Sequence, residues 1–319
     1  MARALARVRA LALALTLVPP LCHPHATAAQ VSAPRSFSVG PVTAVAWPAQ
    51  WRLARELAAR AALPADYPGL PAVAPAPLRL ILAPDGRAID SLTSGAAPGW
   101  GAGIALPDER IILLRADDPE VTRTLRHELA HLALHRAVRI RVPLWFDEGY
   151  AATAAKEWER LGGLELNFAV ARGAVPDLDA LEGALRGSAS TADAAYALAT
   201  AAVSELARRN PTGTLVPLLS RLCAGDDFER AVLATTGLTM GQFEVVWRER
   251  IRRRYGLVVW IIAGGGWSAL TLVLWALLRR RRAFDRPRRA ALDQGWLIEP
   301  EDGGPEATGA SELDPTHRP

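Results

Sequence analysis

The stretch His127-Glu128-Leu129-Ala130-His131 decides how the rest of the chain is interpreted. It lies in a segment, 120–137, that has no glycine or proline and is rich in Ala, Leu, Arg and Glu, so we expect a helix. Residues four apart on a helix share one face, with Cβ atoms roughly 5–6 Å apart. Two imidazoles so placed can bind one metal ion, and Glu128 beside them can hold and deprotonate a water molecule. The alternative is a surface helix with two solvated histidines, because the pattern is short.

A second stretch, Trp145-Phe146-Asp147-Glu148-Gly149-Tyr150-Ala151, follows after a short turn. A hydrolytic zinc site needs three protein ligands and one open position, and two histidines with one carboxylate make such a set. Together the two stretches, HExxH and W-x-x-E-G-x-A, resemble the gluzincin zinc metallopeptidases, in particular the peptidase MA-like group.

The resemblance implies a site that holds one zinc ion per chain. It places the third ligand directly before Gly149, so Glu148 completes the set with His127 and His131, and Asp147 is the competing carboxylate. Zinc there would activate water for the hydrolysis of a peptide or protein substrate.

The resemblance also implies the catalytic residues. Glu128 would be the general base. A tyrosine on a helix beyond the third ligand often stabilises the oxyanion in similar enzymes, and Tyr196 is the best candidate. Tyr196 also lies on an apolar stripe, so a purely structural role is equally consistent with the sequence. Tyr150 is a weaker candidate. We expect His135, one turn of about 5.4 Å beyond His131, to face solvent or to support the site from outside.

Two other features of the site remain open in the sequence. Zinc-bound histidines usually donate their second N–H to a carboxylate or carbonyl, but the position where some gluzincins carry that acid is Ala152 here. The partner is therefore undetermined, and backbone carbonyls could serve. Related enzymes bind substrate along an exposed strand edge, for which 100–105 and 110–114 are candidates. A mobile glycine-rich loop is the alternative for the first.

The N-terminal segment, 1–29, has the features of a secretory signal peptide. It has a basic start, an apolar run at 11–18 that is too short to span a bilayer, and a small-x-small sequence at 26–28. Removal of this segment would remove Cys22 and leave Cys223 as the only thiol, so no intrachain disulfide is expected. We expect Cys223 to be buried.

The segment 257–278 carries no charge and is long enough for about 30 Å of helix, which predicts a transmembrane helix. With a signal peptide before it, the catalytic body would lie outside the cytoplasm and the tail, 279–319, inside. We expect that tail to be disordered. Arginine clusters around the span account for the net charge of +4, which indicates lipid headgroups and not nucleic acid as partners.

The body, 36–256, is expected to be an α+β domain in which a small mixed sheet precedes helices. Strands are predicted at 78–82 and 110–114, and a helix at 47–62. Further helices are predicted at 147–161, 176–185, 191–209, 215–222, 228–235 and 240–255, the last opened by a Thr239-x-x-Gln242 capping box.

These features predict a membrane-anchored, extracytoplasmic zinc metallopeptidase. The alternative is a binding or scaffold protein on the same fold without activity. Endopeptidase and aminopeptidase action are not distinguished by the sequence.

Overall fold

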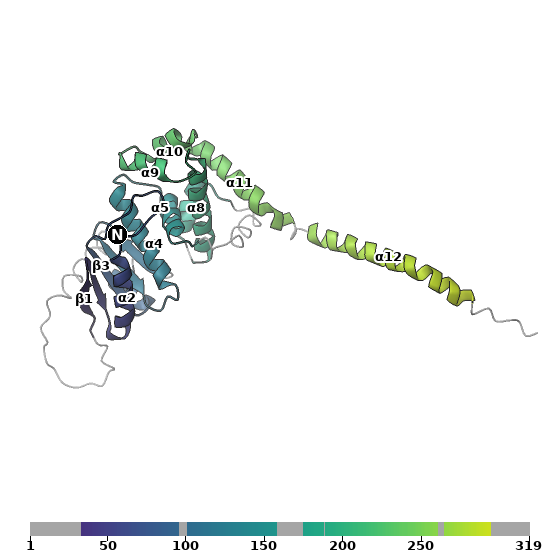
Figure 1. Cartoon of the computed structure of the whole chain (residues 1–319), viewed down its shortest axis with the longest axis horizontal. Coiled ribbons are helices and arrows are strands. Elements are labelled where there is room, and N and C mark those ends of the chain that lie inside the picture. Colours follow the sequence, from purple (N-terminus) through teal and green to yellow (C-terminus); the bar gives the residue numbers. More distant parts are fainter. Residues whose placement is uncertain (1–32, 96–100, 158–174, 188, 261–264, 295–319) are drawn as a thin grey trace, which may run out of the picture. The chain divides into compact units, whose positions relative to one another are not determined.

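The computed structural model describes residues 33–95, 101–157, 175–187, 189–260 and 265–294 (Figure 1). Internal contacts divide the chain into two units, Met1–Val259 and Trp260–Pro319. The first unit contains both motifs. The predicted signal peptide, 1–29, lies outside the described residues.

A five-stranded mixed sheet forms one half of the first unit, with the strand order β1-β2-β3-β5-β4. β1 (Arg35–Val39) is antiparallel to β2 (Val42–Ala46), and β2 is parallel to β3 (Leu78–Ala83). β3 is parallel to β5 (Ile111–Arg115), which pairs antiparallel with β4 (Gly103–Leu106). The α+β fold with a small mixed sheet is therefore as predicted, and β1 and β4 are its edges.

Helices follow and interleave with the strands (Figure 1). The described helices of the first unit are the short 3-10 helix η1 (Pro48–Gln50), α2 (Trp51–Ala61), α3 (Gly86–Thr93), α4 (Val121–Ala137), α5 (Leu144–Ala154), α7 (Leu178–Leu185), α8 (Ala189–Arg209), α9 (Val216–Cys223), α10 (Phe228–Thr236) and α11 (Met240–Trp260).

Alternating side chains of the sheet enter two different cores. Leu80 and Ile112 point to one face, where they pack with Leu57 of α2 and Leu125 of α4. Ile81 on the neighbouring position of β3 points to the opposite face, which α3 covers in part. Because both faces of β3 and β5 are covered, nearly every residue of these strands is buried, and their short runs of Leu and Ile predicted both strands.

A larger core joins the helices. Its centre is an aromatic group in which Trp145 and Phe146 of α5 contact Phe228 of α10, with ring centroids 5.8 and 5.0 Å apart. Trp145 also stacks on Phe243 of α11 at 6.1 Å. The WFDEGYA motif therefore supplies core side chains as well as a candidate ligand.

Several element boundaries differ from the prediction. Strands β1 and β2 and helix α3 were not predicted. α5 begins before residue 147 and ends at Ala154, because the backbone turns left-handed at Lys156, where φ is 58°. The capping box at the start of α11 is present, since Thr239 N–H donates to Gln242 Oε1 and Gln242 N–H donates to Thr239 Oγ1. Cys223 is exposed and not buried as predicted, because it ends α9 outside the apolar row.

The second unit contains α12 (Gly266–Gln294). Within the part of the chain that the structure describes, no helix has the length and apolar character needed to cross a bilayer. The predicted span, 257–278, includes residues 261–264, which lie outside the described ranges. α12 continues through 279–294, so that part of the tail is helical and not disordered, consistent with its content of Arg, Ala and Leu.

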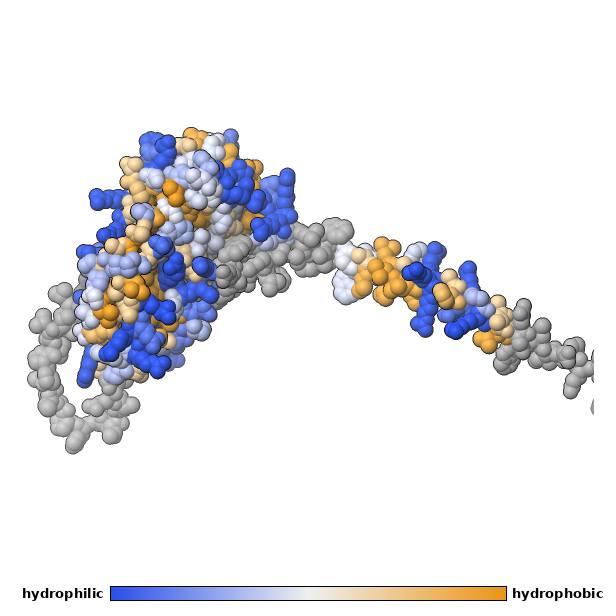
Figure 2. Space-filling view, viewed as in Figure 1, coloured by the Kyte–Doolittle hydropathy of each residue, from blue (hydrophilic) through white to orange (hydrophobic). Residues whose placement is uncertain are grey.

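The two parts of α12 differ in hydropathy (Figure 2). Large apolar side chains on its first half are exposed, including Trp267 at 70% and Leu272 at 64%. The four arginines 279–282 follow directly. The first half therefore presents an apolar surface with no partner among the described residues.

Gly149 marks the closest approach between α5 and α8. A Cβ atom on Gly149 would lie 2.5 Å from the carbonyl oxygen of Ala199 and 2.8 Å from Cγ2 of Val203. Real Cβ atoms do not approach backbone so closely, so any side chain here would separate the two helices.

We predict that Gly149→Ala lowers the free energy of unfolding by about 1–2 kcal/mol, although alanine usually stabilises a helix relative to glycine. Chemical denaturation would measure it. Gly183→Ala is the matched control, because no atom lies within 4 Å of a Cβ at that position on α7. It should stabilise the protein by about 0.5–1 kcal/mol. Equal effects at the two positions would contradict the close approach.

Candidate metal centre

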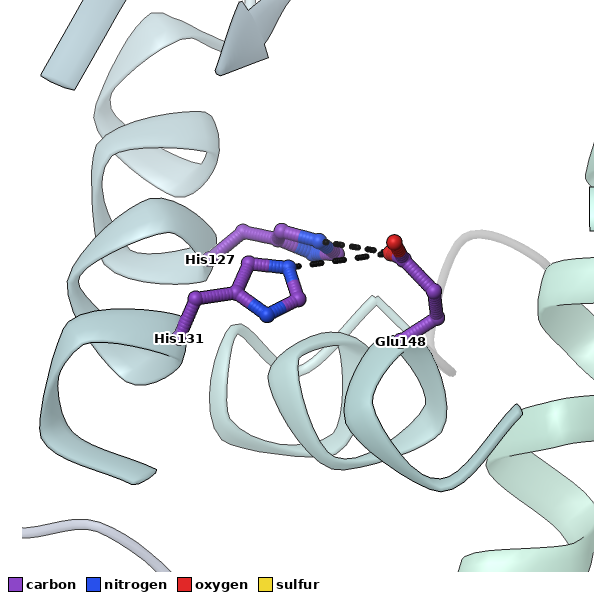
Figure 3. Close-up of side chains that lie close together, drawn as sticks. All are labelled: His127, His131 and Glu148. Atoms are coloured by element: carbon purple, nitrogen blue, oxygen red, sulfur yellow. Dashed lines mark ion pairs between the residues drawn. The ribbon is translucent and has the colours of Figure 1, made fainter. Parts of the chain in front are cut away.

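Two helices bring the predicted ligands together (Figure 3). His127 and His131 lie one turn apart on α4, and their ring centroids are 4.9 Å apart. Both are buried, with exposed fractions of 8% and 9%. Their rings point toward Glu148 on α5, the next helix along the chain.

The spacing of these three groups suits one tetrahedral ion. Nε2 of His127 lies 3.5 Å from Oε2 of Glu148, and Nε2 of His131 lies 3.6 Å from the same oxygen. Ligands of a tetrahedral ion with bonds of about 2.0–2.1 Å are about 3.4 Å apart. The three ligand atoms are all within 4.8 Å of one another. The residues therefore fit a metal ion bound by two nitrogens and one oxygen.

Each imidazole also contacts a carboxylate through its other ring nitrogen, Nδ1. Nδ1 of His127 lies 2.9 Å from Oε1 of Glu157, and Nδ1 of His131 lies 2.7 Å from Oδ1 of Asp147. A carboxylate accepts hydrogen bonds, so each Nδ1 is the donor, and a bound metal ion would take the place of the proton on each Nε2. These partners are side chains, whereas the sequence left backbone carbonyls equally open.

Asp147 also binds the third histidine of α4. Its Oδ2 lies 2.7 Å from Nε2 of His135, while its Oδ1 contacts His131. His135 thus supports the site from outside, one of the two roles expected for it. His131, His135 and Asp147 form a second group close enough to hold an ion. The hydrogen bonds account for that group, and it shares His131 with the first.

The electrostatic environment favours a cation between the histidines and Glu148. Burial lowers the pKa of His127, but its hydrogen bonds with Glu148 and Glu157 outweigh that effect and raise the pKa to about 10. Burial raises the pKa of Asp147, yet His131 and His135 bring it down to about 2. Burial also raises the pKa of Glu148. Its hydrogen bonds with His127 and His131 outweigh that effect and hold the pKa far below its usual range. The site is thus rich in negative charge that a metal ion would neutralise.

Glu128 is buried beside the ligands, with an exposed fraction of 6%. Burial raises the pKa of its carboxyl group, and the charges of His127 and His131 partly offset this effect. Gly103 of β4 lies against it, since a Cβ there would be 2.7 Å from Oε1 of Glu128. The backbone of β4 therefore passes directly over the candidate general base.

Tyr196 of α8 lies at the same site. Its ring centroid is 6.1 Å from that of His127, and the side chain is partly buried. Burial, then the charges of Glu148 and Glu128, raise the pKa of its hydroxyl group. Tyr150 packs on Phe146 within the helical core and has no hydrogen-bond partner among the described residues, so it is the poorer candidate.

One of the two candidate strand edges is available. β4 pairs with β5 on one side only, among the described strands, and lies next to α4. The other candidate, 110–114, corresponds to β5, which pairs with β3 and β4 and is therefore not an edge. Residues 96–100 lie outside the described ranges.

Comparison with known families agrees with this geometry. The sequence model of the Peptidase MA superfamily matches residues 91–253, a range that holds both motifs, Tyr196 and all the carboxylates described above. The chain belongs to the peptidase MA superfamily. No curated protein matches it. The resemblance to gluzincin-like peptidases is thus confirmed at the level of the superfamily.

The two supporting carboxylates of this peptidase MA site were the residues that sequence reasoning missed. Asp147 had a usable signal, because it adjoins Glu148 inside the motif and was weighed as a ligand. Glu157 had none, because it lies beyond the end of α5, where the left-handed residue Lys156 redirects the chain.

We predict that Glu157→Gln and Asp147→Asn each lower the affinity for zinc by about 10–100-fold, because the imidazole loses its charged acceptor. Competition with a chromophoric chelator would measure the change. Glu249→Gln, on the exposed face of α11, is the control and should have no effect. His131→Ala should lose most of the bound metal. Unchanged affinity in both acid variants would mean that these contacts do not orient the ligands.

Proposed function

We propose that the chain is a zinc-dependent peptidase. The observation that carries the proposal is the tetrahedral spacing of His127, His131 and Glu148, with the buried carboxylate of Glu128 next to the histidines. Two imidazoles and a carboxylate are a common catalytic zinc set and leave one position open. Membership of the superfamily supports peptide hydrolysis as the reaction class.

Zinc bound to these residues would polarise the scissile carbonyl and make water a better nucleophile at neutral pH. The chain's own residues would do the rest. Glu128 takes a proton from the attacking water and delivers it to the leaving amine. Burial raises the pKa of the Glu128 carboxyl group, and a raised pKa suits a group that both accepts and returns a proton.

Tyr196 would stabilise the oxyanion. A tyrosine hydroxyl group is protonated at neutral pH, and burial raises the pKa of this one further, so it can donate a hydrogen bond. The edge of β4 would hold the substrate as an added strand, because it lies against Glu128 at Gly103.

We predict that Glu128→Gln keeps zinc content and folding near wild type but lowers peptide turnover by about 10²–10⁴-fold. The amide keeps the shape of the side chain and cannot accept a proton at neutral pH. Metal analysis and hydrolysis of a peptide library would be measured on the same preparation. Wild-type turnover in this variant would remove Glu128 from the mechanism.

The same series tests the alternative of a binding or scaffold protein. That alternative expects no chelator-sensitive hydrolysis in the wild-type chain. Tyr196→Phe should also keep its zinc, and it should lower kcat by about 10²–10³-fold if the hydroxyl group binds the oxyanion. Near-normal turnover in Tyr196→Phe would leave this residue a structural role only.

The location that we propose is a single membrane anchor with the peptidase outside the cytoplasm. It is supported by the uncharged segment 257–278, the signal-like N-terminus, and the apolar side chains exposed on the first half of α12. Such a surface is costly in water and favourable in lipid.

A reporter that is active only outside the cytoplasm should work when fused after Arg250 and fail when fused after Arg289. The reason is that the two fusion points lie on opposite sides of the proposed anchor. A cytoplasmic reporter at the same points is the control and should give the reverse pattern. Activity of the first reporter at both points would contradict an anchor between them.

A further inference from the structure

A second hollow lies at the C-terminal end of α4. It is a half-open cavity of about 710 Å³ between the ends of α2 and α4, the loop 64–77, the turn between β4 and β5, and the loop 138–141. We name it the arginine cavity, after the five arginines that line it. Its volume is within the range of about 300–1,000 Å³ typical of ligand sites.

The arginine cavity is separate from the metal centre. α4 contributes Leu129, Leu132, Ala133 and Arg136 to its wall. At 100° per residue these positions are turned about 140–240° around the helix axis from His127. Among the described residues that line the cavity, His135 alone also contacts Asp147, the carboxylate that binds His131.

Positive charge surrounds this cavity. Asp108 is its sole acidic lining residue among those described. Its five arginines are all exposed, and none forms an ion pair with another described residue: Arg60, Arg110, Arg136, Arg139 and Arg141. Other described arginines of the domain either bind carboxylates, as Arg115, Arg208 and Arg253 do, or are isolated like Arg87. Unpaired cations gathered around one apolar hollow indicate a site for an anionic partner.

Contacts within the domain hold one wall of the cavity, the loop 64–77, in place. Tyr67 of the loop 64–77 is buried under the guanidinium group of Arg126, which lies 5.6 Å from its ring centroid and donates to the carbonyl of Asp66. A short bridge between Ala65 and Val73 closes the loop on itself. The hollow therefore exists before any partner binds, which limits the entropy lost on binding.

Arg110 adds a second observation. Its φ is 54°, in the left-handed region that glycine adopts without strain and other residues rarely occupy. The turn between β4 and β5 thus holds an arginine where the backbone favours glycine, and that arginine lines the cavity.

We propose that the arginine cavity docks an extended peptide segment in which acidic and apolar side chains alternate. The inference rests on the proposed peptidase function and identifies its substrates as proteins that present such a segment away from the cleaved bond. The five cations come from four different parts of the chain, so a ligand with one anionic group would leave most of them unpaired. An extended acidic segment meets several of them and fills the apolar wall between them.

The test uses the full chain carrying Glu128→Gln, with chelator present, so that the probe is not cut and binding does not depend on metal. The probe is a dye-labelled ten-residue peptide of alternating Leu and Glu, followed by fluorescence anisotropy. Arg139→Glu with Arg141→Glu, both in an exposed loop, should raise Kd at least about tenfold. Arg60→Glu lies on a different element and should raise Kd several-fold. It therefore tests the proposal even where the loop variant does not fold.

The matched control is Arg87→Glu with Arg252→Glu, which makes the same charge change at exposed arginines outside the cavity and should leave Kd unchanged. Peptides of alternating Ser and Glu, or of alternating Leu and Gln, should bind more weakly. The first lacks apolar side chains and the second lacks negative charge. Equal loss in the control variant, or no loss in the cavity variants, would overturn the proposal. So would binding of phosphatidylglycerol vesicles, but not peptide, through the same arginines.

A hydrolysis experiment separates this proposal from the proposed function. With Glu128 intact and zinc present, the cavity variants should lower kcat/KM for a substrate extended by the Leu–Glu segment and not for the same substrate without it. Absence of all hydrolysis, with peptide binding intact, would count against the peptidase and not against the docking site. Equal kcat/KM changes for both substrates would count against the docking site alone.

Discussion

The site depends on one crossing, between α4 and the segment that starts with α5. α4 contributes the two imidazoles, and the segment from Asp147 to Glu157 contributes the candidate third ligand and both carboxylates that hold the imidazoles from behind. Burying two histidines and three carboxylates is unfavourable unless each finds an oppositely charged or hydrogen-bonded partner. Here the partners of the α4 histidines all come from the segment that starts with α5, so a change in the crossing geometry would also change the electrostatics of the site.

The rest of the fold holds that crossing in place. The N-terminal half of α4 packs on the sheet through Val121 and Leu125, and its C-terminal half packs in the helical core through Ala130 and Leu134. α5 is fixed on its other side by α8, to which Gly149 allows contact at backbone distance. The same motif that carries Glu148 thus also carries the aromatic side chains of the core and the glycine of the helix contact.

The sequence predicted those parts whose physical signal is local. Spacing of four along α4 predicted the facing imidazoles, and the short apolar runs at 78–82 and 110–114 predicted β3 and β5, which are buried on both faces of the sheet. β1 was missed because its Ser-rich, five-residue stretch is exposed along one side, and β2 because its pattern is blurred by alanine. The position of Glu157 could not be predicted, because it depends on how the chain turns at Lys156 and not on any spacing within a helix. The charge around the arginine cavity was invisible for a similar reason, since its arginines are distributed from residue 60 to residue 141.

Because β4 is short, it limits how a bound peptide would be recognised. β4 has four residues, and in an edge strand only alternate residues direct their N–H and C=O groups away from the sheet. A peptide lying along this edge would therefore make main-chain pairs with about two residues of the enzyme. So few pairs fix the register of a bound chain weakly, and a slip of two residues would lose little. The scissile bond would then have to be chosen by side chains bound elsewhere on the domain, so that selectivity becomes a matter of distance between the anchoring point and the metal ligands.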